Sequence, residues 1–397
     1  MGNKQGRAKN PLRSYQEGRT LRALSQYASS DLGLFKSISH LAKIGITSFL
    51  PYFGLSPVTG PLYVGWDLSY RCNCRCSFCD RWKQSPFNEL STEEIIKVSG
   101  QLKNAGAHHI CIAGGEPLMN KDLPRIINAL HGNDLRTGMC TNGLLLVERA
   151  DEIMAAGLDH IIVSLDGKRE SHDRIRGVKG LYDRAEAGIE HVLEKRGLRA
   201  KPTISVRMLV HEGNIDEIPA WVRKWDKTVD SCLVQPLHHG LHNLYKADGE
   251  IQTVRSTEKL RSVLAETGLS NSFHTRITPD YLADPSRFRH LPCYAGYLVA
   301  RIDPTGNLYG CVEQIERIGN LREHTFGELW KSAEFNCARK RLSKNRQCVC
   351  HYSDSMFNTN LWMLYDKTPL INRMIRSRFG ESITKCHIMP ETRAASL

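Results

Sequence analysis

Short apolar segments alternate with amphipathic segments along the middle of the chain. Six segments have the length and apolar character of buried strands: residues 62–70, 108–114, 136–143, 160–167, 203–210 and 230–237. Five intervening segments carry apolar residues at helical spacing: residues 92–106, 123–133, 147–157, 182–197 and 218–225. Strands that alternate with helices are typical of a parallel sheet with helical crossovers. The pattern therefore predicts an α/β fold in which six strands form an open, partial (β/α)6 barrel of the TIM type.

The alternation stops after about residue 237, which indicates further units on the C-terminal side. At 397 residues the chain also exceeds the usual size of one compact domain. We expect five regions: an N-terminal amphipathic helical segment (1–59), the partial barrel (60–237), an insertion or linker with one or two helices (238–290), a small cysteine-rich domain (291–350) and a C-terminal helical tail (351–397).

Residues 20–50 place apolar side chains at helical spacing, among them Leu34, Ile38 and Leu41, with basic residues on other faces. Such a helix either packs on the main domain or lies on a membrane surface. No stretch is apolar over the length that spans a bilayer, and we expect neither a secretory signal nor a lipid anchor. The sequence therefore predicts a cytoplasmic protein, with peripheral membrane contact through residues 20–50 as an alternative.

The formal net charge of +12 raises the question of nucleic-acid binding. The basic residues are dispersed, with mild local runs at 340–346 and 372–378, and no zinc-finger or RNA-binding signature accompanies them. Nucleic acid is therefore not an expected partner.

Four of the thirteen cysteines crowd into the segment YRCNCRCSFCD at residues 70–80. Cysteines at short spacing in a reducing compartment are more often metal-binding or catalytic than disulfide-bonded. Cys72, Cys76 and Cys79 have the spacing C-x3-C-x2-C and follow the first predicted strand, where parallel barrels build their active sites. Three thiolates can hold three irons of a 4Fe–4S cluster and leave the fourth iron open. A structural zinc site is the alternative, although it needs a fourth ligand and typically uses paired C-x2-C units.

The segment CNCRCSFC resembles the cluster loop of the radical S-adenosylmethionine (SAM) superfamily. Most members carry an apolar residue where Cys74 stands, so we assign Cys74 as a non-ligand. The segment AGGEPL follows the second strand and resembles the GGEP motif of that family, whose backbone and glutamate receive the amino group of the methionine. Glycines suit a backbone that approaches a ligand closely.

Later strand ends carry further resemblances, CTNG at 140–143 and SLDG at 164–167, to segments that hold the methionine and ribose of SAM. The stretch HDRIRG at 172–177 resembles one that is common in members with an added cysteine domain. Phe78 matches an aromatic residue near the adenine, and Arg207 is a candidate partner of the SAM carboxylate. The resemblance thus implies these SAM contacts: Phe78, Gly114, Gly115, Glu116, Pro117, Asn142, Ser164, Asp166 and Arg207.

A second cysteine set, Cys293, Cys311, Cys348 and Cys350, resembles the auxiliary-cluster extension called the twitch domain, or a reduced SPASM domain. Four thiolates would ligate a further 4Fe–4S cluster completely, although the C-x-C spacing at 348–350 departs from the usual wider one. Zinc held by the same cysteines is the alternative, and His351 could replace one of them.

Other candidate residues receive no fixed role. Clustered His238, His239 and His242 face either a substrate or their own backbone, and Gln235 could line a pocket. Five further cysteines are expected as core or surface thiols, or have no assigned role: Cys111, Cys140, Cys232, Cys337 and Cys386.

The resemblance implies reductive cleavage of SAM and a 5'-deoxyadenosyl radical that abstracts hydrogen from a biosynthetic substrate, giving oxidation or bond formation at an unactivated carbon. It implies an electron donor such as flavodoxin or ferredoxin and a peptide or small-molecule substrate. Peptides, sugars, lipids and cofactor precursors all stay open. The alternative class is a non-catalytic iron–sulfur or zinc protein that binds nucleic acid or a partner, which leaves the GGEP, CTNG and SLDG segments without a purpose.

Overall fold

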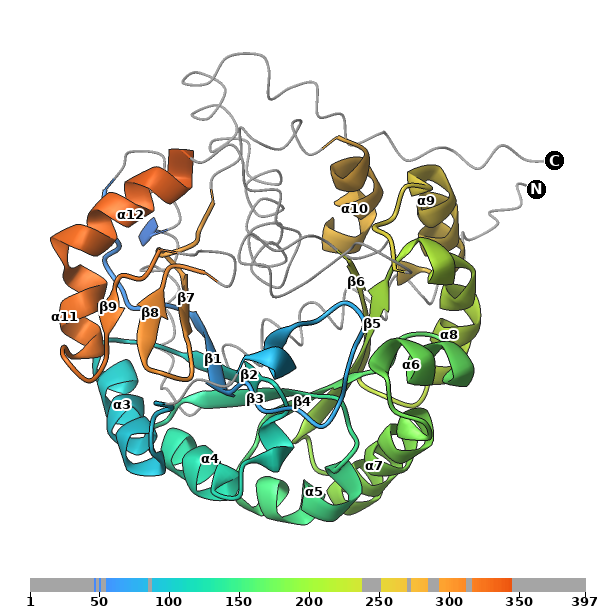
Figure 1. The fold of residues 1–397 in the computed structure, drawn as a ribbon, viewed down its shortest axis with the longest axis horizontal. Helices are drawn as coiled ribbons and strands as arrows, with labels where there is room; N and C mark the ends of the chain where they lie inside the picture. The colour runs from blue at the N-terminus through green and yellow to red at the C-terminus, as the bar shows by residue number, and fades with distance from the viewer. Residues whose placement is uncertain are drawn as a thin grey trace, which may run out of the picture.

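A curved sheet of nine strands organises the protein, seen in a computed structural model that describes residues 46–47, 50, 55–84, 88–237, 251–269, 273–284, 293–311 and 316–344. The strand order is β6-β5-β4-β3-β2-β1-β7-β8-β9. The sheet is open, and its helices follow its outer side in an arc (Figure 1). The expected open α/β barrel is therefore confirmed.

The six predicted strands form one parallel series, and three short C-terminal strands extend it. Their bounds are β1 Tyr63–Ser69, β2 His109–Gly114, β3 Arg136–Thr141, β4 His160–Ser164, β5 Thr203–Val210, β6 Ser231–Pro236, β7 Val299–Ile302, β8 Asn307–Tyr309 and β9 Gly319–Asn320. β7 pairs in parallel with the edge of β1 that β2 leaves open, whereas β8 and β9 add in antiparallel fashion. The described part of the cysteine-rich region thus continues the barrel sheet.

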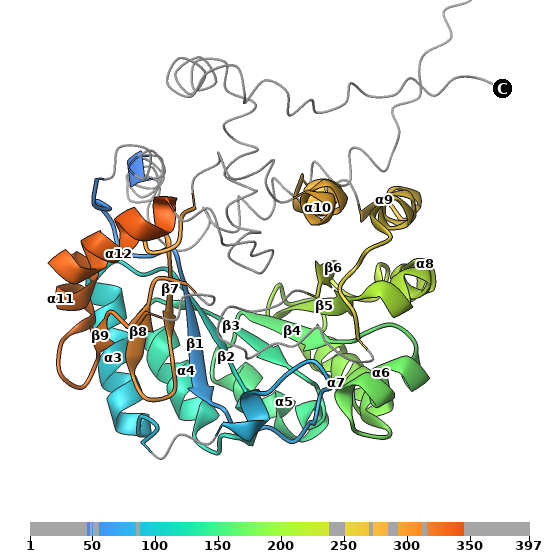
Figure 2. The same ribbon diagram turned by 45° about the horizontal axis from the view of Figure 1, so that its top comes forward.

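Helices connect the strands and close both ends of the arc. Their bounds are α3 Thr92–Asn104, α4 Leu123–Gly132, α5 Leu146–Ala155, α6 Arg169–Arg176, α7 Leu181–Arg196, α8 Ile218–Trp225, α9 Thr257–Glu266, α10 Phe273–Ala283, α11 Phe326–Lys331 and α12 Ala333–Lys344, with short 3-10 turns η1 Arg81–Lys83, η2 Pro117–Met119 and η3 Glu212–Glu217. α9 and α10 lie at one end, and α11 and α12 at the other (Figures 1 and 2). The first pair are the helices expected in the linker region.

Alternate residues of each strand divide between the helix-covered side and the opposite side, as the pleat requires. Trp66, Ile110, Met139 and Val206 belong to the hydrophobic core with the helices. Their strand neighbours therefore point to the other side, which we call the concave face. It carries polar side chains, among them Asp67, Cys111, Cys140 and Arg207.

Several predicted regions fall outside the described residues. Only three residues of the predicted helix at 20–50 are described, and the tail at 351–397 and most of the histidine loop after residue 237 are not. Of the helices that are described, none is long and apolar enough to cross a membrane.

Candidate active site

The cysteine loop between β1 and η1 is held in place by the C-terminal end of α6. The backbone N–H of Arg75 donates to the carbonyl of Arg176 at 3.1 Å, and that of Ser77 donates to the carbonyl of Ile175 at 2.9 Å. Within the loop, the N–H of Cys79 donates to the carbonyl of Cys76. The loop is therefore anchored to α6 through backbone hydrogen bonds, and its thiols take no part in these bonds.

The HDRIRG segment accounts for this anchor. Gly177 ends α6 with φ of 70°, and a Cβ there would stand 2.7 Å from the carbonyl oxygen of Arg75. Arg176 donates from Nε to Asp166 at 2.6 Å, and its guanidinium lies 5.2 Å from the ring centre of Phe78. The segment thus joins the cysteine loop to the end of β4.

The loop thiols differ in their readiness to ionise. The buried Cys74 thiol hydrogen-bonds to the sulfurs of both Cys72 and Cys76. This bonding lowers the pKa of Cys72 to about 7 and also lowers the pKa of Cys76, in both cases against the effect of burial. Burial raises the pKa of Cys79 to about 11. Thiolates are the form that ligates iron, so Cys72 and Cys76 are the loop thiols closest to that form.

Three thiols on one backbone-anchored loop have the donor chemistry of a 4Fe–4S cluster, in which each thiolate binds a different iron. Across the described part of the chain, no three His, Cys, Asp or Glu side chains are grouped to hold a single metal ion.

Glu116 is a buried carboxylate at the end of β2, with 3% of its surface exposed. One of its oxygens accepts hydrogen bonds from Thr141 Oγ1 at 2.7 Å and from the Leu118 N–H at 3.0 Å. The other oxygen accepts from the Asn142 N–H at 2.8 Å. Burial raises the pKa of Glu116 to about 7, and these hydrogen bonds oppose that rise. A cation brought next to Glu116 would favour its ionised form.

The two glycines before Glu116 are required by the approach of the β1 end. The N–H of Gly115 donates to the carbonyl of Ser69 at 2.7 Å, and the N–H of Glu116 donates to that of Arg71 at 2.9 Å. A Cβ on Gly114, whose φ is 121°, would lie 2.2 Å from the Ser69 carbonyl oxygen, and one on Gly115 would lie 2.1 Å from that of Arg71. The sequence suggested close approach of a ligand; the structure adds close approach of the chain's own backbone.

Replacing Gly115 with alanine is expected to push the cysteine loop away from β2 and to lower the free energy of unfolding by about 1–3 kcal/mol, the usual cost of overpacking. Urea unfolding under anaerobic conditions measures this loss. Gly132→Ala is the matched control, because among the described residues no atom beyond its chain neighbours and its own helix backbone lies within 4 Å of a Cβ built there. Equal stability of the two variants would contradict the packing argument.

Asn142 links the end of β3 to the cysteine loop. Its Nδ2 donates to Asn73 Oδ1 at 2.7 Å and lies 3.9 Å from the sulfur of Cys72. Because its N–H also bonds to Glu116, the GGEP and CTNG segments and the cysteine loop meet at this residue.

The SLDG segment begins at Ser164, the last residue of β4, and contains the fully buried Asp166. Asp166 accepts from the N–H of Leu209 at 2.8 Å as well as from Arg176. Burial acts to raise the pKa of Asp166, but Arg176 and the hydrogen bonds outweigh it and hold the pKa below the ordinary value. Asp166 therefore braces β4, β5 and α6.

Arg207 lies opposite Ser164 in the β4–β5 register and reaches across the concave face. Its Nη2 donates to the Cys140 sulfur at 3.0 Å and its Nη1 to Gln235 Oε1 at 3.2 Å. Gln235 is thus joined to Arg207 on the concave face, and its place in a pocket stays a prediction.

An ion-pair cluster beside the cysteine loop was not predicted. Asp67 accepts from Arg81 at 2.7 Å and from Arg301 Nη2 at 2.8 Å, and Arg301 also donates to the Tyr70 hydroxyl at 2.6 Å. Arg81 further donates to the carbonyl of Gly114 at 3.3 Å. The cluster joins β1, the cysteine loop, the GGEP segment and β7.

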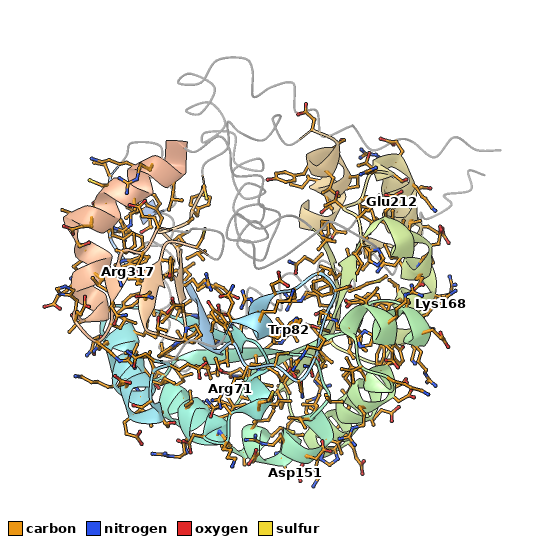
Figure 3. The ribbon with its side chains drawn as sticks, in the orientation of Figure 1. Arg71, Trp82, Asp151, Lys168, Glu212 and Arg317 are labelled. Carbon is orange, nitrogen blue, oxygen red and sulfur yellow. The ribbon has the colours of Figure 1, made fainter. Side chains whose placement is uncertain are left out.

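Figure 3 labels Trp82, the residue after Arg81, inside the arc of helices, whereas Asp151 lies on its outer side. The guanidinium of Arg75 lies 4.7 Å from the centre of the Trp82 ring. The middle of the cysteine loop thus packs on η1.

Only half of the second cysteine set lies in the described residues. The N–H of Gly296 donates to the carbonyl of Gly310 at 2.8 Å, which brings the chain near Cys293 beside the chain near Cys311. Cys348 and Cys350 lie outside the described residues, as do His351, the three loop histidines (His238, His239 and His242) and Cys386. The predicted four-cysteine set remains a prediction.

Comparison with known families identifies two domains in the chain. Residues 66–224 match the model of the radical SAM superfamily. Residues 293–352 match the model of SPASM, an iron–sulfur cluster-binding domain. The two matches cover the cysteine loop with most of the parallel strands, and the second cysteine set.

Among curated proteins, the Fe-coproporphyrin III synthase of Methanosarcina barkeri is 37% identical over 160 residues, which are 40% of this chain and 39% of that protein. The AdoMet-dependent heme synthase of the same organism is 27% identical, covering 75% of this chain and 90% of that protein. The PqqA peptide cyclase of Xanthomonas axonopodis pv. citri is 26% identical, covering 69% of this chain and 75% of that protein.

Among solved structures, Streptococcus suis SuiB bound to S-adenosylmethionine has a TM-score of 0.58 at 19% identity and covers 89% of this chain and 84% of its own. SuiB bound to the precursor peptide SuiA has a TM-score of 0.57 at 18% identity, covering 83% and 78%. These similarities show a shared fold.

Proposed function

We propose that this chain, a member of the radical SAM superfamily with a C-terminal iron–sulfur cluster-binding domain, uses 4Fe–4S clusters and SAM as its cofactors. It cleaves SAM reductively and abstracts a hydrogen atom from an unactivated carbon of a biosynthetic substrate, leading to oxidation or bond formation. The observation that supports this proposal best is the junction at Asn142, where the cysteine loop, Glu116 and the end of β3 meet through hydrogen bonds. A protein that only bound iron would not need a buried carboxylate at that junction.

In this proposal Cys72, Cys76 and Cys79 hold the catalytic 4Fe–4S cluster, which when bound supplies the electron that breaks the bond between the SAM sulfur and its 5'-carbon. The chain's own residues bind and orient SAM beside the loop. Glu116 accepts a hydrogen bond from the amino group of the methionine, since it is a buried carboxylate that is itself bonded to Asn142.

The remaining proposed SAM contacts come from β5, from the end of β4 with the segment that follows it, and from the cysteine loop. Arg207 is proposed for the carboxylate, opposite Ser164 in the register of β4 and β5. Asp166 and Phe78 shape the site through Arg176, which contacts both. The full proposed set is Phe78, Gly114, Gly115, Glu116, Pro117, Asn142, Ser164, Asp166 and Arg207.

We further propose that Cys293, Cys311, Cys348 and Cys350 ligate the auxiliary cluster. Support comes from the domain match over residues 293–352, which contains all four. A flavodoxin or ferredoxin is the proposed electron donor, and membrane contact through residues 20–50 stays a hypothesis that liposome flotation can test.

The affinity for SAM is expected to increase as the pH rises through about 7, because ionised Glu116 pairs with the amino cation and burial has raised its pKa to that value. The limiting gain is about tenfold per pH unit below the pKa. The stability of the protein without ligand changes with pH in the opposite direction. The raised pKa of Glu116 adds to the free energy of unfolding fully below the ordinary pKa of 4.5, and this contribution is lost as the pH rises through 7. Anaerobic calorimetric titration with SAM between about pH 6 and 8 measures the binding effect. A pH profile identical to that of Glu116→Gln would contradict it.

A peptide is the first candidate substrate. It is supported by the similarity to PqqA peptide cyclases and by the fold shared with SuiB, which binds a precursor peptide. A tetrapyrrole cofactor precursor is the second candidate, because the heme synthase match covers 90% of that relative and the Fe-coproporphyrin III synthase match has the higher identity.

The two substrate classes can be separated with the reconstituted enzyme. Fe-coproporphyrin III is titrated in and its visible absorption followed, while a peptide library is incubated with SAM and dithionite and searched by mass spectrometry for altered masses. A saturable absorption change together with faster release of 5'-deoxyadenosine supports the tetrapyrrole. Altered peptides without such a change support the peptide.

A further inference from the structure

Cys111 and Cys140 form a pair of thiols on the concave face and belong to neither predicted set of cluster ligands. Their sulfur atoms lie 3.7 Å apart on the adjacent strands β2 and β3. Cys111 is 3% exposed, whereas Cys140 is partly exposed. Cys140 is therefore the member of the pair that is not fully buried.

Polar and cationic groups surround this pair. Arg207 donates to the Cys140 sulfur at 3.0 Å, and Tyr63 hydrogen-bonds to Cys111. The hydrogen bond from Cys111, with Arg207 and Arg81 nearby, lowers the pKa of Cys140 to about 6, and the pKa of Cys111 is raised. At neutral pH the pair therefore shares one proton and one negative charge.

This environment differs from that of an ordinary core cysteine. Cys232, on β6, packs against the hydrophobic core instead. The sequence predicts the same role for all three cysteines, because a cysteine in an apolar strand is usually a small core residue.

The pair is close in the chain to the proposed SAM site. Cys140 belongs to β3 and precedes Asn142, the residue that follows the end of β3, by two positions, a rise of about 6.6 Å in extended backbone. Asn142 in turn contacts both the cysteine loop and Glu116. A carbon radical formed beside the cysteine loop and facing the concave side would thus lie near the Cys140 sulfur.

We propose that the Cys111–Cys140 pair is a hydrogen-atom donor to a carbon radical formed in the barrel. The inference rests on the proposed radical function and adds a step to it. The S–H bond of a thiol is weaker than an alkyl C–H bond, so transfer from sulfur to carbon is downhill, whereas water and aliphatic hydroxyl groups hold their hydrogen too strongly to donate it.

The step balances with one electron and one proton. The pair, as one thiol and one thiolate, loses its S–H hydrogen atom to the carbon, and a C–H bond forms. The thiyl radical left behind is stabilised by the neighbouring thiolate, whose charge Arg207 neutralises. A low-potential one-electron donor of the flavodoxin or ferredoxin class supplies an electron, solvent supplies a proton, and the thiol–thiolate pair is restored.

This role narrows the reaction class. A product radical that receives a hydrogen atom undergoes no net oxidation, so the pair favours bond formation or inversion at carbon over dehydrogenation.

The test needs no knowledge of the substrate. Reconstituted enzyme is incubated with SAM and dithionite in D2O without added thiols, so that thiols carry deuterium while carbon-bound hydrogens do not exchange. Without substrate, the 5'-deoxyadenosyl radical itself takes its hydrogen from the pair. Wild type is expected to release mainly singly deuterated 5'-deoxyadenosine, whereas Cys140→Ser and Cys111→Ser are expected to reduce that fraction severalfold. Cys232→Ser is the matched control and is expected to equal wild type, and iron content and SAM affinity check that all variants are folded and loaded.

Two results would overturn the inference in distinguishable ways. Undeuterated 5'-deoxyadenosine from wild type, or deuteration that persists in both serine variants, removes the pair as donor while the radical function stands. No 5'-deoxyadenosine from any variant removes the proposed function and the inference with it.

Discussion

Replacing Asp67 with alanine is expected to lower the free energy of unfolding by about 3–5 kcal/mol, the cost of leaving buried charges without their partner. Asp67, Arg81 and Arg301 have side chains that are at most 6% exposed. Burial alone would raise the pKa of Asp67, but the two guanidinium groups outweigh it and hold the pKa below the ordinary value. The carboxylate is therefore ionised at neutral pH, and its removal leaves the buried cations Arg81 and Arg301 without this ion-pair partner.

Denaturant unfolding of Asp67→Ala under anaerobic conditions measures this loss, with Asp151→Ala as the matched control. Asp151 also binds two basic partners, His191 at 2.8 Å and Lys195 at 3.0 Å, but its side chain is 58% exposed. Solvent screens such pairs, so the control is expected to lose much less stability than Asp67→Ala. Equal losses in the two variants would contradict the role of burial.

The second large effect is expected for Glu116→Gln, which should weaken SAM binding by about 2–5 kcal/mol and reduce SAM cleavage accordingly. Glutamine keeps the size of the side chain but removes the negative charge. Glu116 now accepts hydrogen bonds from three donors, which belong to Leu118, Thr141 and Asn142. The NH2 group of glutamine is itself a donor, so at least one of these hydrogen bonds would be lost. The SAM site and the Asn142 junction would both be disturbed.

Calorimetric titration with SAM under anaerobic conditions measures the change in affinity. Glu148→Gln, on α5 and paired with Arg184 at the surface, is the control and should bind SAM as wild type does. Unchanged affinity in Glu116→Gln would remove Glu116 from the proposed SAM site.

The barrel could be predicted because the sequence patterns of its strands and helices each lie within a short segment of the chain. Each strand is a short apolar run and most crossovers carry a helical apolar period, so the six parallel strands and their helices follow from the sequence. α6 was not expected, because its sequence RESHDRIR has almost no apolar residues and so shows no helical apolar period. The structure shows that the end of this helix holds the cysteine loop through backbone hydrogen bonds.

Contacts between distant residues could not be predicted in the same way. Arg301 lies 234 positions from Asp67, and it reaches Asp67 only because β7 pairs with β1. Cys111 and Cys140 lie 29 positions apart and meet only through the register of β2 and β3. The motif residues, by contrast, could be predicted from the sequence, because the family resemblance assigns the GGEP, CTNG and SLDG segments to the ends of strands.

The most direct test of the proposed function is reductive SAM cleavage by the reconstituted protein and by a variant with alanine at Cys72, Cys76 and Cys79. Both are loaded with iron and sulfide under anaerobic conditions, their iron is counted, and release of 5'-deoxyadenosine is followed after adding dithionite. The account predicts that wild type releases 5'-deoxyadenosine, and that the variant releases none while keeping the iron of one auxiliary cluster. Failure of wild type to cleave SAM, or cleavage that survives the loss of all three cysteines, would contradict it.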